Sequence, residues 1–279
     1  MGATISTVRI ATWNVNSLPS RLPRLRDWLA AADPDVVVLQ ETKIGPDAFP
    51  TEEIAAAGYE AVHRGQGRWN GVALLSRVGI AEVETDLPGA PGFPDPADPP
   101  EARYIAATCA GVRVAGVYVP NGRTPDDPHY QYKLAWLGAL AEHLAGVAGG
   151  ADPFAVMGDF NVAPADEDVW DIAQFAQSTH VTAPERQALA RLRALGLTDI
   201  VPTISKGPHP YTFWDYRGGA FHKAFGMRID LVYANRAFAD RVRAAFVDRD
   251  ARKPGVRGTP APSDHAPVVV DLDDAGALP

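Results

Sequence analysis

Nine short runs of mainly apolar and β-branched residues recur along the chain, each four to eight residues long. Runs of this length and composition are typical of β-strands, whereas amphipathic helices need longer periodic segments. The predicted strands are Val8–Trp13, Val36–Gln40, Gly71–Ser76, Tyr104–Thr108, Val112–Val119, Phe154–Met157, Ile229–Ala234, Ala244–Val247 and Val268–Asp271. Val36–Leu39 and Val268–Val270 are apolar without interruption, which favours strands covered on both faces.

Helical periodicity lies between some of these runs. Apolar residues recur three and four positions apart in Arg21–Ala32, His129–Val147 and Pro184–Leu195, which predicts three helices. The chain has no GxGxxG loop, which argues against a dinucleotide-binding domain. Helices among hairpin-like strand pairs predict an α/β (α+β) fold in which sheets are stacked inside layers of helices.

The main compositional break is the segment 88–100, which has six prolines in 13 residues. We interpret it as a loop and not as a domain linker, because strand-like segments flank it on both sides. With 279 residues, 46% of them apolar, the chain is predicted to form a single domain over 1–279 with its core at about 8–271.

The single cysteine, Cys109, excludes an internal disulfide and a cysteine-rich metal site. The first residues show neither the charged region nor the apolar run of a signal peptide. No apolar stretch reaches the ~18 residues that a membrane-spanning helix needs. We therefore expect a cytoplasmic protein without a membrane partner.

The formal net charge is −8, but the charge is unevenly distributed. Residues 203–257 carry 11 Lys and Arg against 5 Asp, a balance of +6, which leaves −14 for the rest of the chain. A locally basic face on an acidic protein is compatible with nucleic-acid binding. A solvated surface without any partner explains the same numbers, so charge alone does not choose between them.

Amide and carboxylate residues gather where the predicted strands begin or end. They are Asn14, Asn16, Glu41, Asn121, Asp159, Asn161, Asp230 and Asp264, with Tyr118 and His265 beside them. Loops at the edge of a sheet are the usual place for a functional site. Taken singly, each of these residues also reads as an ordinary turn or helix cap.

Taken together, these residues predict a divalent-metal site. Like charges 4 Å apart repel by about 4 kcal/mol at an effective dielectric constant of 20, and a divalent cation relieves that repulsion. Oxygen ligands without thiolates favour Mg²⁺ or Mn²⁺ over Zn²⁺. Such a site suits phosphodiester hydrolysis, because the cation and amide donors neutralise the phosphoryl oxygens while an Asp activates water. A His paired with an Asp stays charged and can assist.

The ordered set of motifs closely resembles the exonuclease III family of abasic-site endonucleases, within the endonuclease/exonuclease/phosphatase superfamily. The resemblance covers about residues 8–271. It rests on Ala11-Thr-Trp-Asn-Val-Asn-Ser17, Leu39-Gln-Glu-Thr-Lys43, Trp69-Asn-Gly-Val-Ala73, Tyr118-Val-Pro-Asn-Gly122, Gly158-Asp-Phe-Asn161, Tyr211-Thr-Phe-Trp-Asp-Tyr216, Arg228-Ile-Asp230 and Ser263-Asp-His265.

The resemblance implies a DNase I-like, four-layer α/β sandwich with two mixed β-sheets face to face and helices outside. It implies Mg²⁺ as cofactor, with Mn²⁺ as a substitute. Glu41 is then the principal ligand, with Asn14 and Asp264 beside it. A second metal position, where the family has one, would have Asp159, Asn161 and His265 as its ligands.

The resemblance also implies catalytic roles. Asp159 would activate water, and Asn161 would hold the water and the oxyanion. His265, oriented by Asp230, would contact the scissile phosphate, with Tyr118 near the phosphate or leaving group. The identity of the general base and the number of metals stay open at this point.

The implied function is a DNA repair nuclease that cuts 5′ to an abasic site and leaves a 3′-OH. Exonuclease activity from 3′ ends and 3′-phosphatase or phosphodiesterase activity on duplex DNA would accompany it. An extruded abasic sugar needs a small apolar pocket. The matching positions are Phe213, Met227 and Ile229, with Trp214 nearby. Many family members carry Trp where this chain has Met227, so strict abasic-site selectivity is not expected.

Further DNA contacts are predicted for Asn121, which lies in the Tyr118 motif, and for Arg123, which follows it. The segment 215–225 mixes Gly, aromatic and basic residues, and we predict a mobile loop that presses Arg217 or Lys223 on DNA. The alternatives are a phosphoinositide or lipid phosphodiesterase of the same superfamily and a non-catalytic nucleic-acid-binding regulator on this fold. Nothing in the sequence suggests an obligate oligomer, so a monomer is expected.

Overall fold

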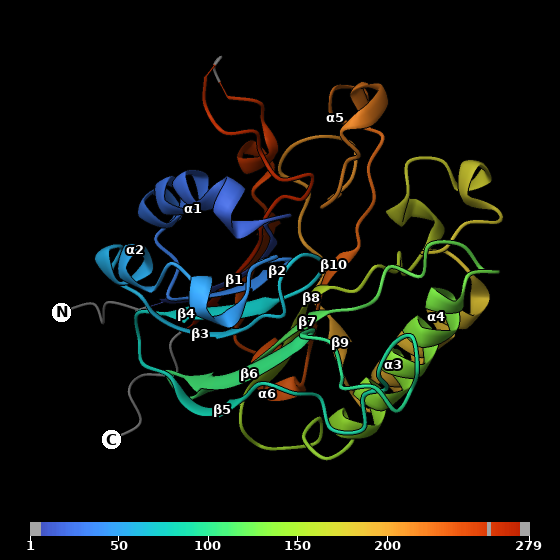
Figure 1. Ribbon diagram of the computed structural model, residues 1–279, viewed down its shortest axis with the longest axis horizontal. Helices are drawn as coiled ribbons and strands as arrows, with labels where there is room; N and C mark the ends of the chain where they lie inside the picture. The colour runs from blue at the N-terminus through green and yellow to red at the C-terminus, as the bar shows by residue number, and fades with distance from the viewer. Residues whose placement is uncertain (1–6, 256–257, 274–279) are drawn as a thin grey trace.

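The computed structural model describes residues 7–255 and 258–273, and in this part of the chain the strands form two six-stranded sheets (Figure 1). The first sheet has the order β11-β12-β1-β2-β4-β3. Its strands are β1 (Thr7–Asn14), β2 (Val36–Gln40), β3 (Glu60–Arg64), β4 (Val72–Ser76), β11 (Val242–Val247) and β12 (Val268–Asp273). The second has the order β5-β6-β7-β8-β10-β9. Its strands are β5 (Ala81–Glu84), β6 (Tyr104–Cys109), β7 (Val112–Tyr118), β8 (Phe154–Asp159), β9 (Thr198–Asp199) and β10 (Asp230–Ala234).

Both sheets are mixed, as predicted. β1 pairs in parallel with β2, and β7 pairs in parallel with β8, while the other pairings within the sheets are antiparallel. Every residue of β2 is buried, as expected for an apolar strand covered on both faces.

The two sheets pack face to face over a shared apolar core. Val38 of β2, Ile105 of β6 and Met157 of β8 belong to this core and are fully buried. A Cβ atom on Gly116 of β7 would lie 2.0 Å from Cγ1 of Val38, so the sheets approach this closely because residue 116 has no side chain. Sheet-on-sheet packing thus builds the centre of the molecule.

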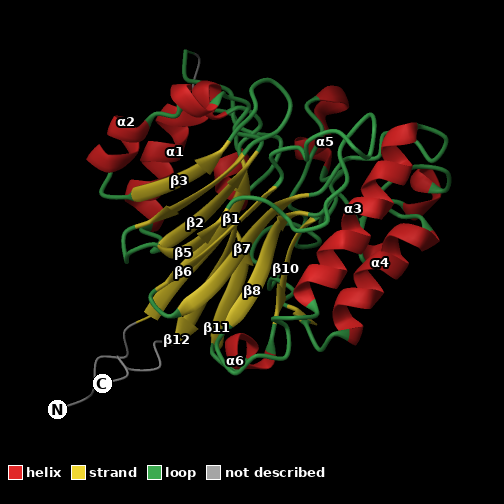
Figure 2. Cartoon of the chain, turned by 60° about the horizontal axis from the view of Figure 1, so that its bottom comes forward, coloured by secondary structure: helices red, strands yellow, loops and turns green. Residues whose placement is uncertain are grey.

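Helices cover the outer face of each sheet (Figure 2). The helices α1 (Leu18–Ala32) and α2 (Thr51–Ala56) lie over the first sheet, where Leu25 and Leu29 pack with Val37. The helices α3 (Pro128–Leu144) and α4 (Ala183–Ala194) lie over the second sheet, where Trp136 and Leu189 pack with its strands. The predicted four-layer sandwich is therefore confirmed. No described helix combines the length and apolar character that a membrane span requires.

The nine predicted strands are all present, with ends that differ by one or two residues. Prediction missed β3, β5 and β9 and the short helices α2, α5 (Ala220–Lys223) and α6 (Arg236–Ala239). β5 is exposed and polar and β9 has two residues, so neither carries an apolar signal. The predicted helix over His129–Val147 begins at Pro128 and ends at Leu144. The segment 88–100 is a loop, as predicted.

The strand pairing brings the polar strand ends to one edge of the sandwich. Because β1 and β2 are parallel, Asn14 pairs with Gln40, directly before Glu41. Because β7 and β8 are parallel, Tyr118 pairs with Asp159. β10 begins at this same edge, where Asp230 lies opposite Asp159.

Candidate active site

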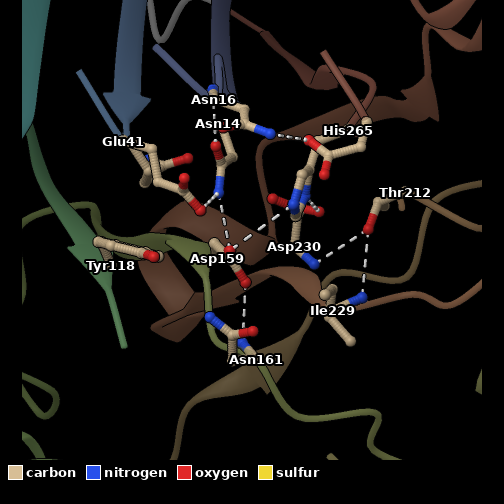
Figure 3. Close-up of polar contacts among 12 residues, drawn as sticks. Asn14, Asn16, Glu41, Tyr118, Asp159, Asn161, Thr212, Ile229, Asp230 and His265 are labelled. Carbon is tan, nitrogen blue, oxygen red and sulfur yellow. Dashed lines mark hydrogen bonds and ion pairs between the residues drawn. The ribbon is translucent and has the colours of Figure 1, made fainter. Parts of the chain in front are cut away.

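A cavity of about 420 Å³ opens at this edge of the two sheets. Figure 3 shows the polar contacts among the side chains that meet there. Most of its walls come from residues that the sequence singled out. The lining residues are Asn16, Glu41, Lys43, Asn121, Asp159, Asn161, His180, Phe213, Asp215, Tyr216, Arg217, Met227, Ile229, Asp264 and His265.

The buried amide of Asn14 joins two acidic residues that lie on different sheets. Its Nδ2 donates to Glu41 Oε1 at 2.8 Å and to Asp159 Oδ2 at 2.9 Å. Its Oδ1 accepts from the backbone N–H of Asn16 at 3.0 Å. Asn14 therefore presents its nitrogen, not its oxygen, to the carboxylates, and its predicted role as a metal ligand stays a prediction.

Lys43, which the sequence analysis did not assign, balances the charge of Glu41. Its Nζ lies 2.7 Å from Glu41 Oε2 and 2.6 Å from Asn16 Oδ1. Although burial opposes ionisation, the Lys43 ammonium and the Asn14 amide hold the pKa of Glu41 below its ordinary value. Asn16 continues the network by donating to Asp264 Oδ1 at 3.0 Å. The signal that was missed is the Lys at the end of the Glu41 motif.

His265 lies between two buried carboxylates. Its Nδ1 is 2.8 Å from Asp230 Oδ2, and its Nε2 is 3.8 Å from Asp159 Oδ2. Thr212 Oγ1 accepts from the backbone N–H of Asp230 at 3.1 Å and so fixes the start of β10. Burial opposes the charge on His265, but the carboxylates outweigh it and raise its pKa to about 10. The imidazolium form is therefore the resting state at neutral pH.

Asp159 is the carboxylate of this cluster whose pKa is raised. Burial raises its pKa to about 7, Asp230 and Glu41 add to the rise, and His265 opposes it. A group that titrates near neutral pH suits general acid–base chemistry.

Asn161 is held by the strand ends around it. Its Nδ2 donates to the backbone carbonyl of Val119 and its Oδ1 accepts from Asn121 Nδ2, both at 3.0 Å. Its own N–H donates to Asp159 Oδ1 at 2.9 Å. Its backbone is left-handed, with φ of +52°, a conformation that Asn adopts more readily than most residues other than Gly.

Tyr118 is buried beside Glu41 and lies against a cation. The guanidinium of Arg103 lies 4.6 Å from the Tyr118 ring centroid, and its Nη1 donates to the Tyr118 carbonyl at 3.2 Å. Burial raises the pKa of Tyr118 well above its ordinary value, and Glu41 adds to the rise. Tyr118 is therefore a neutral phenol that can donate a proton.

The donor set fits a divalent cation. Ligating atoms of Glu41, Asp159 and His265 all lie within 4.8 Å of one another, and a ring nitrogen of His265 could bind a cation only after losing its proton. Two of the three offer carboxylate oxygens, which Mg²⁺ and Mn²⁺ prefer. A cation would also relieve the repulsion that raises the pKa of Asp159. Asp264 lines the cavity as predicted, whereas the Asn161 oxygen is already engaged with Asn121.

Comparison with known proteins places the chain. The sequence pattern of the endonuclease/exonuclease/phosphatase family matches residues 11–265. The chain belongs to the endonuclease/exonuclease/phosphatase family. It is 27% identical to exodeoxyribonuclease III of Haemophilus influenzae, over 94% of this chain and 98% of that protein. It is 26% identical to the DNA repair nuclease APEX1 of Danio rerio, over 96% of this chain and 83% of that protein.

Solved structures agree with this assignment. A 3′–5′ exonuclease, NExo, from Neisseria meningitidis superposes with a TM-score of 0.87 at 39% identity, covering 96% of this chain and all (100%) of that one. An AP endonuclease from Archaeoglobus fulgidus superposes with a TM-score of 0.85 at 34% identity, with the same coverage. The predicted resemblance to the exonuclease III branch of the family is confirmed, and this family member is a hydrolytic nuclease.

The residues predicted to form a pocket for the abasic sugar lie in the cavity wall. Phe213, Met227 and Ile229 line the cavity, and the Phe213 ring lies 4.9 Å from the His265 ring between centroids. His180, which the sequence analysis missed, lines the same cavity and contacts the Asn161 carbonyl through Nδ1 at 2.5 Å. A lone His in a polar loop carries no sequence signal that separates it from a surface residue.

The prediction that Trp214 contacts DNA is wrong. Its side chain is 1% exposed and belongs to the core between the sheets. The Phe221 ring packs edge-on against it, with centroids 5.3 Å apart. Phe213 and Trp214 are consecutive residues, and successive side chains of an extended segment point to opposite sides. Phe213 therefore faces the cavity, and Trp214 faces the core.

The other predicted DNA contacts are accessible. Arg217 lines the cavity with its side chain 91% exposed and forms an ion pair with Asp215 at 3.0 Å. Asn121 lines the cavity, and the side chain of Arg123 is 60% exposed near Asp127. The segment 215–225, which we predicted to be a mobile loop, contains short helical turns anchored by the buried Phe221. Its mobility stays a prediction.

The basic segment 203–257 is less free than its charge suggests. Many of its cations pair with carboxylates, and buried Arg228 contacts both Asp168 and Asp199 at 2.6 and 3.0 Å. Lys206 and Lys253 both pair with Asp250. Arg257 lies outside the described residues. The predicted basic face is therefore partly neutralised by ion pairs, and its residue Arg217, itself paired with Asp215, lines the cavity.

Proposed function

We propose that this chain hydrolyses the phosphodiester bond of duplex DNA 5′ to abasic sites and leaves a 3′-OH. We propose in addition that it removes nucleotides and phosphate groups from 3′ ends. One observation carries the proposal: the buried Asp159–His265–Glu41 cluster opens directly onto the apolar wall of Phe213, Met227 and Ile229. The names of its relatives, exodeoxyribonuclease III and DNA repair nuclease APEX1, support the same substrate class.

The geometry supports a proton path around the phosphate. Glu41 and Asp159, with His265 beside them, would hold Mg²⁺ or Mn²⁺, which when bound supplies positive charge for the phosphoryl oxygens. Asp159 accepts a proton from the attacking water, because it is a carboxylate of the cavity wall held beside the charged His265. The charged His265 donates hydrogen bonds to the phosphate and stays charged through Asp230.

The bond changes then balance. The water oxygen forms a bond to phosphorus, the bond from phosphorus to the 3′ oxygen breaks, and that oxygen takes up a proton. Tyr118 is a neutral phenol beside Glu41 and is assigned to the leaving-group side. Arg103 keeps the Tyr118 ring in place by stacking on it.

The pocket wall sets the expected selectivity. Met227 is flexible and fills space loosely compared with an aromatic ring. His180 shares the cavity with it. We therefore propose that abasic-site cleavage competes with processing of 3′ ends. A structure of the Neisseria neighbour, described as a 3′ phosphatase bound to a product DNA hairpin, supports the second activity.

We extend the proposal to a cytoplasmic monomer. All residues of the cluster come from one chain, so catalysis needs no second copy. Cys109 is buried and free, which agrees with a reducing compartment.

The test uses a 5′-labelled duplex with one abasic-site analogue, with Mg²⁺ or with EDTA, and His265→Ala as the control. A band 5′ to the lesion that requires Mg²⁺ and is absent in the variant supports the endonuclease. A ladder from the 3′ end without preference for the lesion supports the 3′-end activity and contradicts the proposed endonuclease activity. Full activity in EDTA at several hundred millimolar salt contradicts the proposal, since metal and phosphate contacts carry it. No cleavage at all would favour phosphoinositide or lipid substrates.

A further inference from the structure

A fully buried lysine lies behind the active-site wall, at the place where the strands β7 and β8 end. Lys133 of α3 has 0% side-chain exposure. Its Nζ donates to the backbone carbonyl of Asn161 at 2.6 Å and to that of Asn121 at 3.2 Å. One ammonium group therefore binds both loops that carry cavity-lining amides.

The charge of Lys133 is balanced by an equally buried carboxylate. Glu185 of α4 has 0% side-chain exposure and forms an ion pair with Lys133. Thr179 completes the group, because its Oγ1 lies 3.2 Å from Lys133 Nζ and 2.6 Å from Glu185 Oε1. We call Lys133, Thr179 and Glu185 the Lys133 cluster.

The Lys133 cluster also holds the segment that carries His180. Glu185 Oε1 accepts from the backbone N–H of His180 at 2.9 Å. Thr179 Oγ1 lies 3.0 Å from the carbonyl of Asn121. The same Asn161 carbonyl that binds Lys133 is in contact with His180 Nδ1. Three cavity-lining residues, Asn121, Asn161 and His180, thus depend on one buried ion pair.

The backbone at this position needs support. Asn161 has φ of +52° and His180 has φ of +82°, both in the left-handed region. Such conformations persist where the surroundings hold them. A buried ion pair is weak evidence for stability alone, because apolar residues of similar volume often replace it without loss. Its contacts to the backbone of two loops that line the cavity indicate a role in geometry.

We propose that Lys133 and Glu185 are positioning residues for the hydrolysis, acting through the backbone of Asn161 and His180. The inference rests on the proposed function for its rate measurements, but its structural readout does not. Displacing a catalytic group by about 1 Å costs on the order of 100-fold in rate. We expect a loss of that size when the ion pair is removed.

The first experiment compares Lys133→Met/Glu185→Gln with Leu140→Ala. The double variant removes both charges and keeps an acceptor at position 185 for the α4 N-terminus. Leu140 is fully buried on α3, two turns from Lys133, and packs in the outer core. Its truncation destabilises the same helix without touching Asn161. Single-turnover cleavage is measured at saturating DNA and Mg²⁺, well below each variant's unfolding temperature.

The double variant is expected to lose about 100-fold in the single-turnover rate while its KM for DNA stays near the wild-type value. Leu140→Ala is expected to cleave at nearly the wild-type rate. The proposal is overturned if the double variant cleaves at the wild-type rate, or if Leu140→Ala loses as much. If the double variant does not fold, Glu185→Gln alone is measured against the same control, with the same outcomes deciding.

The second experiment is a double-mutant cycle with Asn161→Ala. If Lys133 acts through the Asn161 amide, adding Lys133→Met to Asn161→Ala slows cleavage far less than in the wild-type background. An equal further loss in both backgrounds would show that Lys133 acts elsewhere.

The third readout does not need activity. The contact with the Asn161 carbonyl requires a proton on His180 Nδ1, and burial lowers the pKa of His180 to about 4, so the ring is neutral at pH 7. ¹⁵N NMR of the histidine rings is expected to show the Nδ1–H tautomer in the wild type and a shift toward Nε2–H in the double variant. An unchanged tautomer overturns the proposal. If the wild-type protein cleaves no DNA, the proposed function is disproved, but the NMR result still tests whether Lys133 and Glu185 position His180.

Discussion

His265 Nδ1 lies 2.8 Å from Asp230 Oδ2, and both side chains are buried. Asp230 is the first residue of β10, and His265 lies three residues before β12. The two residues are 35 positions apart in the chain. The contact fixes the proton on Nδ1 and leaves Nε2 directed toward Asp159. It is therefore the contact that maintains a positive charge next to the cavity.

Replacing Asp230 by Asn should lower the pKa of His265 toward its ordinary value. The raised pKa of about 10 means that the charge stabilises the fold fully below about pH 6.5 and is lost as the pH rises through about 10. In metal-free protein, NMR should show no His265 titration between pH 6 and 9. The midpoint should move down in Asp230→Asn, and cleavage at pH 8 should fall by roughly 100-fold or more. A wild-type midpoint near 6.5 would disprove the assignment.

Replacing Asp159 by Asn should abolish cleavage and stabilise the metal-free protein. Its folded pKa of about 7 lies above the ordinary value near 4, so ionisation destabilises the fold increasingly as the pH rises from about 4 to 7. The Asp159→Asn variant avoids this cost, and we expect a gain of about 1–3 kcal/mol in its free energy of unfolding at pH 8. At pH 3.5 the gain should vanish. Urea unfolding at both pH values checks this, and an equal gain at the two would count against it.

With Mg²⁺ bound, the wild type should be more stable than Asp159→Asn at neutral pH. A cation held by Glu41 and Asp159 adds about 2.7 kcal/mol to the free energy of unfolding at 100 times its Kd. Thermal unfolding with and without Mg²⁺ should show a rise in Tm for the wild type. Glu41→Gln should lose most of that rise, while Glu82→Gln on the far edge strand should keep it. A Tm rise of equal size in Glu41→Gln would place the cation elsewhere.

Met227 should control the choice between abasic and intact DNA. It is nearly buried beside Phe213 and Ile229, so Met227→Ala enlarges the pocket wall. We expect the ratio of abasic-site cleavage to 3′-end degradation to fall by about 10-fold, since small changes in an apolar pocket alter selectivity to that degree. Ile204→Ala, an exposed apolar position, is the control. A ratio unchanged in both variants would remove Met227 from the recognition surface.

Phe221 should govern the affinity for DNA and not the chemical step. Its ring lies 4.3 Å from the Arg249 guanidinium and anchors the segment that presents Arg217 to the cavity. Phe221→Ala should release this segment and weaken DNA binding by about tenfold, equal to about 1.4 kcal/mol. The single-turnover rate at saturating DNA should change little. A fall in that rate without a change in binding would contradict this role, and His222→Ala is the neighbouring control.

Much of the fold was predictable because apolar runs, turn residues and helical periodicity are local properties of the chain. The runs at Val36–Gln40 and Phe154–Met157 became central strands, and the periodic segment Arg21–Ala32 became an outer helix. β5 and β9 were missed since short or exposed strands are stabilised by their neighbours, not by their own composition.

The site was predictable as a set of residues, and its electrostatics were not. Asn14 donates to Asp159 across 145 positions, a contact that depends on how two sheets pack. Trp214 was assigned to DNA and proved to be core, because which face of its segment points inward is decided by packing. Lys133 occupies the buried stripe of α3, three residues before Trp136 and seven before Leu140, a sequence signal that became meaningful only beside Glu185.

The sequence by itself determined the family, most of the strand segments and the chemical types gathered at their ends. Tertiary structure decided which carboxylate is hard to ionise, which His stays charged, and which loops a buried Lys holds. The physical reason is that desolvation and charge–charge energies depend on distances of a few ångströms between distant segments. Those distances exist only after the two sheets have packed.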